Sequence, residues 1–199
     1  MFAGPVPWLT RHLLQKAQDP SDHIKQCLMF LFKIERVEIV STAKDEHSHE
    51  CFLINVLLSE PDDKSKATTT NFQIQRTFKD FKQLHKVVVH WSDKHMWLDP
   101  KYGVSECVYC ALFKKGASSW PGSLTHIMTS KKKLAKQLDG CLNAYIAQAR
   151  RPRPSHFECQ GFDHIPSIVT RFLLQGVPGA VNADGDSQAS NLETKNTNE

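Results

Sequence analysis

The stretch Asn71-Phe-Gln-Ile-Gln-Arg-Thr-Phe-Lys-Asp-Phe-Lys-Gln-Leu-His85 changes its hydrophobic period partway along. Up to Gln75, apolar and polar residues alternate, which is the period-two pattern of a half-buried strand. From Phe78 onward, apolar residues are spaced by three or four positions, which is typical of one face of a helix. The sequence therefore predicts a strand that runs almost directly into a helix.

The segments on either side complete the predicted architecture. Lys33 to Val40 and Cys51 to Leu58 also alternate, so we expect two earlier strands. Downstream, residues 99–130 read as a long irregular connection, and Thr129 or Ser130 can cap a second helix. Arg151-Pro-Arg-Pro154 ends that helix, and a last helix is expected to open at Pro166 and Ser167. Strands that precede helices predict an α+β fold, with a three-stranded antiparallel sheet packed against a helical subdomain.

The chain has the length and composition of one globular domain. It has 199 residues, of which 40% are hydrophobic and 23% charged, so a packed core is expected. We predict an N-terminal extension over residues 1–32, the domain over 33–175 and a disordered tail over 176–199, where polar residues and glycine dominate. The sequence shows neither an apolar run of bilayer length nor a secretory signal, so a cytoplasmic protein is expected.

Positive charge is concentrated in one part of the chain. Between residues 71 and 150 there are 13 Lys or Arg and 5 Asp or Glu, a net charge of 13 − 5 = +8, although the whole chain carries only +4. Such a segment favours an anionic partner, either a lipid head group or a nucleic acid. A solvated, lysine-rich surface is the alternative. Nucleic acid is disfavoured as a partner because no groove-reading helix or exposed aromatic array is evident.

The order of these elements resembles that of PX (phox homology) domains, and four motifs are similar to motifs of that family. The segment from Gln75 to His85 is similar to that family's third strand and following helix. Leu138-Asp-Gly-Cys-Leu-Asn-Ala-Tyr145 and Ser167-Ile-Val-Thr-Arg-Phe-Leu173 look like its later helices, and Trp120-Pro-Gly122 like its proline-containing loop. The resemblance covers roughly residues 34–174. It implies a domain that binds phosphoinositides on endosomal membranes.

The residues that the resemblance assigns to head-group binding match the family only in part. Arg76 stands at the first basic position of the motif and Phe78 at the ring-stacking position. Thr77 stands where the family normally has its principal phosphate-pairing arginine, and Leu138 where it has a second arginine. Three lysines near the start of the second helix could replace the missing charges, with less selectivity because lysine is a flexible point charge. The predicted phosphoinositide-binding residues are Arg76, Phe78, Lys131, Lys132 and Lys133.

The long connection carries apolar side chains beside lysines, a combination that suits insertion into a membrane surface. A tryptophan next to Pro-Gly could equally fold back onto the core. The predicted membrane-insertion loop comprises Lys114, Lys115, Trp120 and Leu124. Together these residues predict a peripheral membrane adaptor with relaxed head-group selectivity. The alternative is a PX-like module that has lost phosphoinositide binding and contacts a protein partner.

Cys107-Val-Tyr-Cys110 has the two-residue gap of half a zinc site. Histidines such as His85, His90, His95 and His126 could complete it. A redox pair or ordinary packed cysteines are the alternatives, since the six cysteines are expected to be reduced in the cytoplasm. No cofactor is expected. The sequence contains no phosphate-binding glycine loop, zinc-protease motif or nucleophile elbow, so we do not expect an enzyme.

Overall fold

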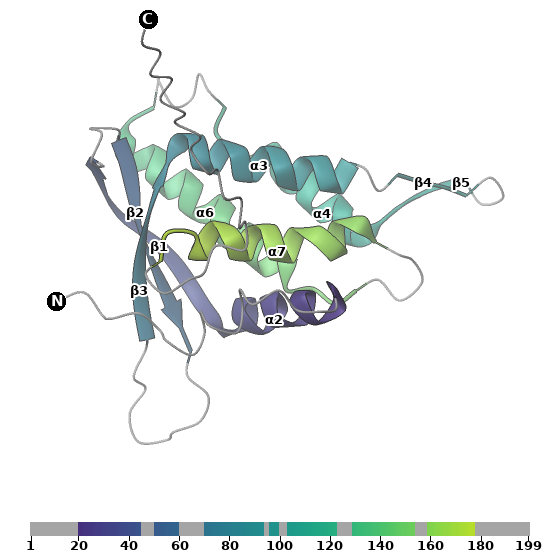
Figure 1. The fold of residues 1–199 in the computed structure, drawn as a ribbon. Helices are drawn as coiled ribbons and strands as arrows, with labels where there is room; N and C mark the ends of the chain where they lie inside the picture. The colour runs from purple at the N-terminus through teal and green to yellow at the C-terminus, as the bar shows by residue number, and fades with distance from the viewer. Residues whose placement is uncertain are drawn as a thin grey trace, which may run out of the picture.

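The computed structural model describes residues 20–44, 50–59, 70–93, 96–99, 103–122, 129–153 and 159–177. The elements in chain order are α2 (Pro20–Lys33), β1 (Ile34–Lys44), β2 (Glu50–Leu58), β3 (Thr70–Thr77), α3 (Phe78–Asp93), β4 (Met96–Asp99), β5 (Gly103–Glu106), α4 (Val108–Ala117), α6 (Lys131–Ala149) and α7 (Gln160–Leu174). The sheet stands at one end of a group of helices, and the β4–β5 hairpin projects at the other (Figure 1). The fold is α+β, which confirms the predicted class.

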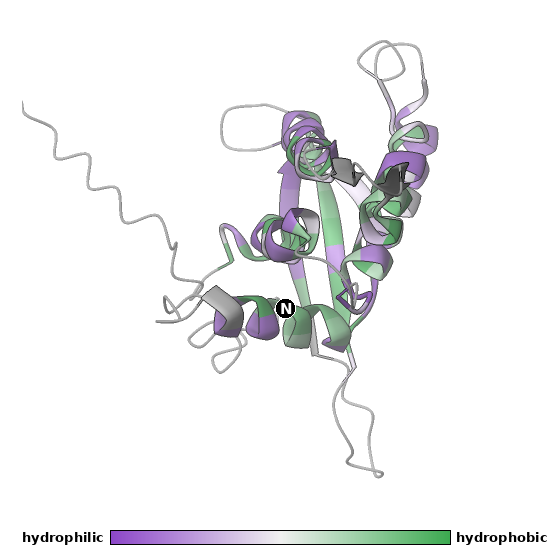
Figure 2. Cartoon of the chain, turned by 90° about the vertical axis from the view of Figure 1, so that its right-hand side faces the viewer, coloured by the Kyte–Doolittle hydropathy of each residue, from purple (hydrophilic) through white to green (hydrophobic). Residues whose placement is uncertain are grey.

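The main sheet is antiparallel, with β2 between β1 and β3. In β2 the alternating side chains of Phe52, Ile54, Val56 and Leu58 are buried, as the period-two pattern predicts. The three strands predicted from alternation are therefore confirmed. The described helices carry both hydrophobic and hydrophilic residues, as expected for helices that bury one face (Figure 2). None of them combines the length and apolar character needed to cross a bilayer.

The transition from β3 to α3 needs no intervening loop. Thr77 is the last residue of β3, and Phe78 is the first of α3. The backbone N–H and hydroxyl of Thr77 donate to Asp80 Oδ2 at 2.7 and 2.8 Å, and the Asp80 N–H donates to Thr77 Oγ1 at 3.3 Å. This reciprocal arrangement is a capping box, which satisfies N–H groups that a helix start leaves unpaired. Thr77 thus has a structural role at the predicted helix start.

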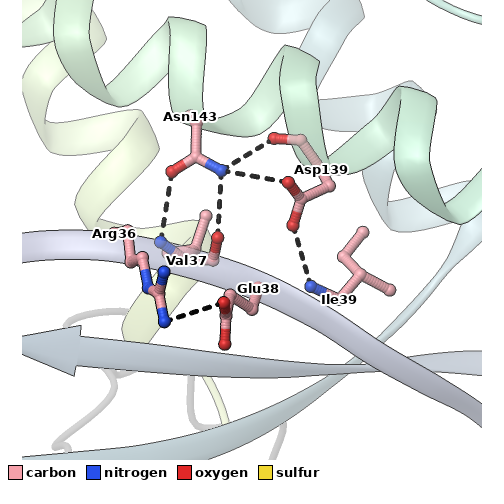
Figure 3. Close-up of polar contacts among 6 residues, drawn as sticks. All are labelled: Arg36, Val37, Glu38, Ile39, Asp139 and Asn143. Atoms are coloured by element: carbon pink, nitrogen blue, oxygen red, sulfur yellow. Dashed lines mark hydrogen bonds and ion pairs between the residues drawn. The ribbon is translucent and has the colours of Figure 1, made fainter.

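The outer edge of β1 is covered by side chains of α6 (Figure 3). Asn143 accepts from the Val37 N–H at 3.1 Å and donates through Nδ2 to the Val37 carbonyl at 2.9 Å. Asp139 Oδ1 accepts from the Ile39 N–H at 2.9 Å. An amide side chain carries both N–H donors and a carbonyl acceptor, so Asn143 replaces a neighbouring strand at this position. These contacts fix α6 against the sheet and cover an edge that could otherwise pair with another chain.

The predicted N-terminal boundary is wrong. Residues 20–32, assigned to an extension, belong to α2, whose Cys27, Phe30 and Leu31 are buried in the core. His23 Nε2 and Ser167 Oγ lie 3.1 Å apart, which joins α2 to α7. The apolar face formed by Cys27, Phe30 and Leu31 spans little more than one helical turn, which is too short for the sequence pattern to predict a packed helix. The part of the predicted tail beyond Val177 lies outside the described residues.

Two helix assignments downstream also need correction. The predicted irregular connection contains α4, where Tyr109, Cys110 and Phe113 are buried on one face. The last helix begins at Gln160, six positions before the expected start at Pro166. Proline removes one backbone N–H from a helix interior, but α7 continues through it because its apolar face is packed along its whole length. The predicted N-cap at Ser130 is confirmed, since its side chain accepts from the Lys133 N–H.

Replacing Asn143 with Ala should lower the free energy of unfolding by about 2 kcal/mol, because a half-buried N–H and C=O of β1 lose their partners. Urea denaturation measures the change. Lys136→Ala is the matched control, since Lys136 is an exposed residue of the same helix and should change stability by less than about 0.5 kcal/mol. Equal losses in the two variants would show that the edge contacts of β1 contribute nothing specific.

Candidate functional site

Arg76 is buried within the protein. Its side chain is 9% exposed. Nε donates to the Phe172 carbonyl at 2.8 Å, Nη2 to the Gln175 carbonyl at 2.6 Å and Nη1 to the Gln75 carbonyl at 2.7 Å. Phe172 lies in the last turn of α7, where carbonyl groups have no partner further along the helix. The guanidinium therefore serves as a charged C-terminal cap for α7.

The predicted contact between Arg76 and a lipid head group is consequently wrong. Burial lowers the pKa of Arg76 to about 10, so the group remains protonated at neutral pH. Its planar fork of donors is occupied by carbonyl oxygens, which accept the same hydrogen bonds that a phosphate would accept. The sequence motif correctly located a basic residue at the end of β3. Its orientation depends on α7, which lies about 100 residues downstream.

The three lysines at the start of α6 do not converge with Arg76. Lys131 Nζ lies 2.7 Å from Glu50 Oε1 at the beginning of β2, and its side chain is 71% exposed. Lys132 and Lys133 are also exposed. Arg76, in contrast, points toward the end of α7. The predicted single pocket formed by Arg76 and Lys131 to Lys133 is therefore not formed.

A different concave surface gathers lysines on the other side of α3. Its cavity volume is about 740 Å³. We call it the basic groove, and its lining residues are Glu50, Thr77, Phe78, Lys79, Lys82, Gln83, His85, Lys86, Trp120, Pro121 and Gly122. The three lysines are spaced by three and four positions along α3, so they share one helix face. Within the described part of the chain, Lys79 and Lys86 form no ion pair.

Aromatic side chains form the inner wall of the basic groove. Trp120 is only 9% exposed, and its ring stacks on His85 with centroids 4.8 Å apart and planes 15° apart. His85 and Tyr145 share a hydrogen bond of 2.8 Å. Burial lowers the pKa of His85, so a neutral imidazole is expected at neutral pH. Phe78, predicted to stack under a ligand ring, is half-buried and lines the groove.

The predicted membrane-insertion loop is largely wrong. Trp120 packs against core rings, so it is unavailable for insertion into a bilayer. Lys114 and Lys115 lie in the last turn of α4, where a cation is favoured by the helix dipole. Lys114 Nζ also lies 3.6 Å from Asp93 Oδ1. Leu124 lies outside the described residues.

A second groove, with a volume of about 710 Å³, lies between α3 and α7. Arg76 and Arg171 line it, but so does Asp80, which already accepts from Thr77. Trp91 and His164 stack across it with ring centroids 3.6 Å apart. The donors of Arg76 are bound to carbonyls, so they are already occupied at this groove.

The Cys-x-x-Cys motif acquires a third cysteine in the structure. Cys159 Sγ lies 3.6 Å from both Cys107 Sγ and Cys110 Sγ, and all three side chains are buried. Burial raises the pKa of Cys107, and the hydrogen bond with Cys159 together with burial raises that of Cys110. The histidines that the sequence offered as partners are absent from the cluster among the described residues, since His85 and His90 lie elsewhere. His95 and His126 fall outside them.

Sequence reasoning missed the main lining residues of the basic groove and the third thiol. The spacing of Lys79, Lys82 and Lys86 by three and four positions indicates a shared helix face, but spacing alone does not distinguish a ligand-binding face from an ordinary solvated one. Cys159 could not have been found by spacing, because 49 residues separate it from Cys110.

Comparisons with known proteins give no match: no family model fits the chain, and no curated protein or solved structure is detectably similar to it.

Replacing Arg76 with Met should lower the free energy of unfolding by at least about 2 kcal/mol, because the carbonyls of Phe172 and Gln175 lose a charged donor. Arg76→Lys should recover only part of the loss, since an ammonium lacks the planar fork. Urea denaturation measures both variants, with the exposed Lys79→Met as the control. An Arg76→Met protein as stable as the wild type would contradict the capping role.

Proposed function

We propose that this chain is a peripheral membrane protein that binds the anionic head group of a phosphoinositide in the basic groove. The observation that carries the proposal is the presence of three lysines on one face of α3, opposite an aromatic wall, in a concave surface of about 740 Å³. A cavity of this volume is in the range of small-molecule sites. The PX-like resemblance of the sequence is consistent with this class of ligand.

The charge distribution of the groove supports an anionic ligand. Lys79, Lys82 and Lys86 line it, and Glu50, the one carboxylate among its described lining residues, is paired with Lys131. Lys131 thus offsets part of the negative charge that Glu50 places beside the groove. Positive side chains at one concave surface raise the local concentration of anions and strengthen the attraction to an acidic membrane.

The same residues argue for weak discrimination between head groups. No arginine lines the basic groove among the described residues. Lysine meets a phosphate as a mobile point charge, whereas arginine fixes its geometry with a bidentate fork. Phe78 and the Trp120–Pro121 turn offer an apolar surface against which an inositol ring can pack. We therefore propose relaxed selectivity among phosphorylated inositol lipids.

A second candidate function is protein interaction by a PX-like module that does not bind phosphoinositides. Two observations favour it. Arg76 donates to backbone carbonyls, and Thr77, at the position of the missing arginine, is part of the cap of α3. Both positions of the basic motif thus have structural roles, as expected if head-group binding by that motif has been lost.

The first candidate predicts that Lys79→Gln/Lys86→Gln weakens binding to phosphoinositide-containing liposomes by at least about tenfold, because each lysine near an anionic surface contributes on the order of 1 kcal/mol. Sedimentation with liposomes of matched composition, with and without phosphoinositide, measures the effect. The control is Lys115→Gln/Lys136→Gln, which removes the same charge from exposed positions outside the groove. Equal losses in both pairs, or equal sedimentation with both liposomes, would overturn the proposal.

The second candidate predicts that Thr77→Arg creates phosphoinositide binding that the wild type lacks. The new guanidinium would stand at the rim of the basic groove, beside Phe78 and Lys79. Loss of the cap should reduce stability by about 1 kcal/mol, so folding is checked by circular dichroism. A wild-type chain that already binds these liposomes as well as Thr77→Arg contradicts the second candidate.

A further inference from the structure

We propose that Cys107, Cys110 and Cys159 bind one structural zinc ion as thiolates. The three residues come from two regions of the chain, the start of α4 and the start of α7. They form the one group of three or more potential metal-ligating side chains found among the described residues. This site is separate from the basic groove, and none of its members lines that groove.

The sulfur positions match tetrahedral coordination. Zinc binds thiolate sulfur at about 2.3 Å, so two sulfurs on one tetrahedral ion lie roughly 3.8 Å apart. Cys159 Sγ lies 3.6 Å from Cys107 Sγ and 3.6 Å from Cys110 Sγ. All three sulfurs lie within 4.8 Å of one another. Small movements of the side chains would therefore place an ion at bonding distance from all three.

The backbone around the cluster favours negative charge. Cys107 and Cys159 are the N-cap residues of α4 and α7, and Cys110 lies in the first turn of α4. Two helix N-termini thus face the thiols with their positive ends, which stabilises thiolates. The Phe162 N–H donates to Cys159 Sγ at 3.3 Å. Such N–H donors to sulfur are typical of the shell that supports metal-bound thiolates.

Gly161 indicates that the space beside the sulfurs is restricted. A Cβ atom at this position would lie 2.6 Å from Cys110 Sγ and 3.7 Å from Cys159 Sγ. Any larger residue would displace the Cys110 sulfur from the cluster. Glycine is thus required here for the close approach of α7 to α4, and that approach brings the third thiol to the pair.

The remaining cysteines provide an internal comparison. Cys27, Cys51 and Cys141 are equally buried, yet none joins a comparable group among the described residues. Burial alone therefore does not bring thiols together in this chain. Zinc fits this donor set best because it accepts sulfur ligands in tetrahedral geometry and needs no redox partner.

Three thiolates leave one coordination position for a fourth donor, which the described residues do not supply. The ion would connect α4 to the start of α7 across 49 to 52 residues of intervening chain. Its expected role is to hold these two helices together.

The test uses the full chain, purified under reducing conditions and stripped of metal with a chelator. Titration with Zn²⁺ against a chromophoric chelator should give one bound ion per chain, and Zn²⁺ should raise the melting temperature. Co²⁺ should give the charge-transfer and d–d absorption of a tetrahedral thiolate site. Cys159→Ser should lose both signals, whereas Cys141→Ser, a buried cysteine of α6 outside the cluster, should retain them.

Two results would overturn the proposal. One is a folded wild-type chain that binds neither Zn²⁺ nor Co²⁺ under these conditions. The other is a Cys159→Ser variant that binds them as the wild type does. If Cys159→Ser fails to fold, the wild-type Co²⁺ spectrum decides alone: absorption without thiolate charge transfer overturns the assignment, and charge transfer of the strength expected for three thiolates supports it.

Discussion

The hydrogen bonds between the Arg76 guanidinium and the carbonyls at the C-terminal end of α7 connect strand β3 to the last described helix. Arg76 is the penultimate residue of β3, and α7 is the last described helix. α7 also contacts α2, α3, α4 and α6, so its position affects every major helix (Figure 1). A buried guanidinium is tolerated only when its donors are paired. Here backbone oxygens at a helix C-terminus provide both the partners and a favourable dipole.

This constraint also fixes which basic side chains line each flank of α3. Arg76 donates to the end of α7, whereas Lys79, Lys82 and Lys86 line the basic groove on the opposite side of α3. On that side, Trp120 stacks on His85 and forms the inner wall of the basic groove. Glu50, at the same groove, is paired with Lys131. The two flanks of α3 thus differ: one carries the cap of α7, and the other carries the lysines of the basic groove.

Local patterns in the sequence were sufficient for the sheet and for the start of α3. Alternation located β1, β2 and β3, and the shift in period at Phe78 located the helix, because both signals arise from which side chains are buried. α2 and α4 were missed because each buries a short apolar face that is recognisable only against α7 and α6. The candidate functional sites could be predicted from the sequence less well than the fold. The orientations of Arg76 and Trp120, and the approach of Cys159 to Cys107, depend on contacts between distant segments.

We propose that the basic groove, and not the groove between α3 and α7, receives an anionic inositol head group. The most direct measurement is an NMR titration of ¹⁵N-indole-labelled protein with a soluble inositol phosphate. Trp120 lines the basic groove and Trp91 the other groove. If the head group binds in the basic groove, the Trp120 indole resonance should shift saturably and the Trp91 resonance should stay unchanged. A shift confined to Trp91, or no shift at either tryptophan, would contradict it.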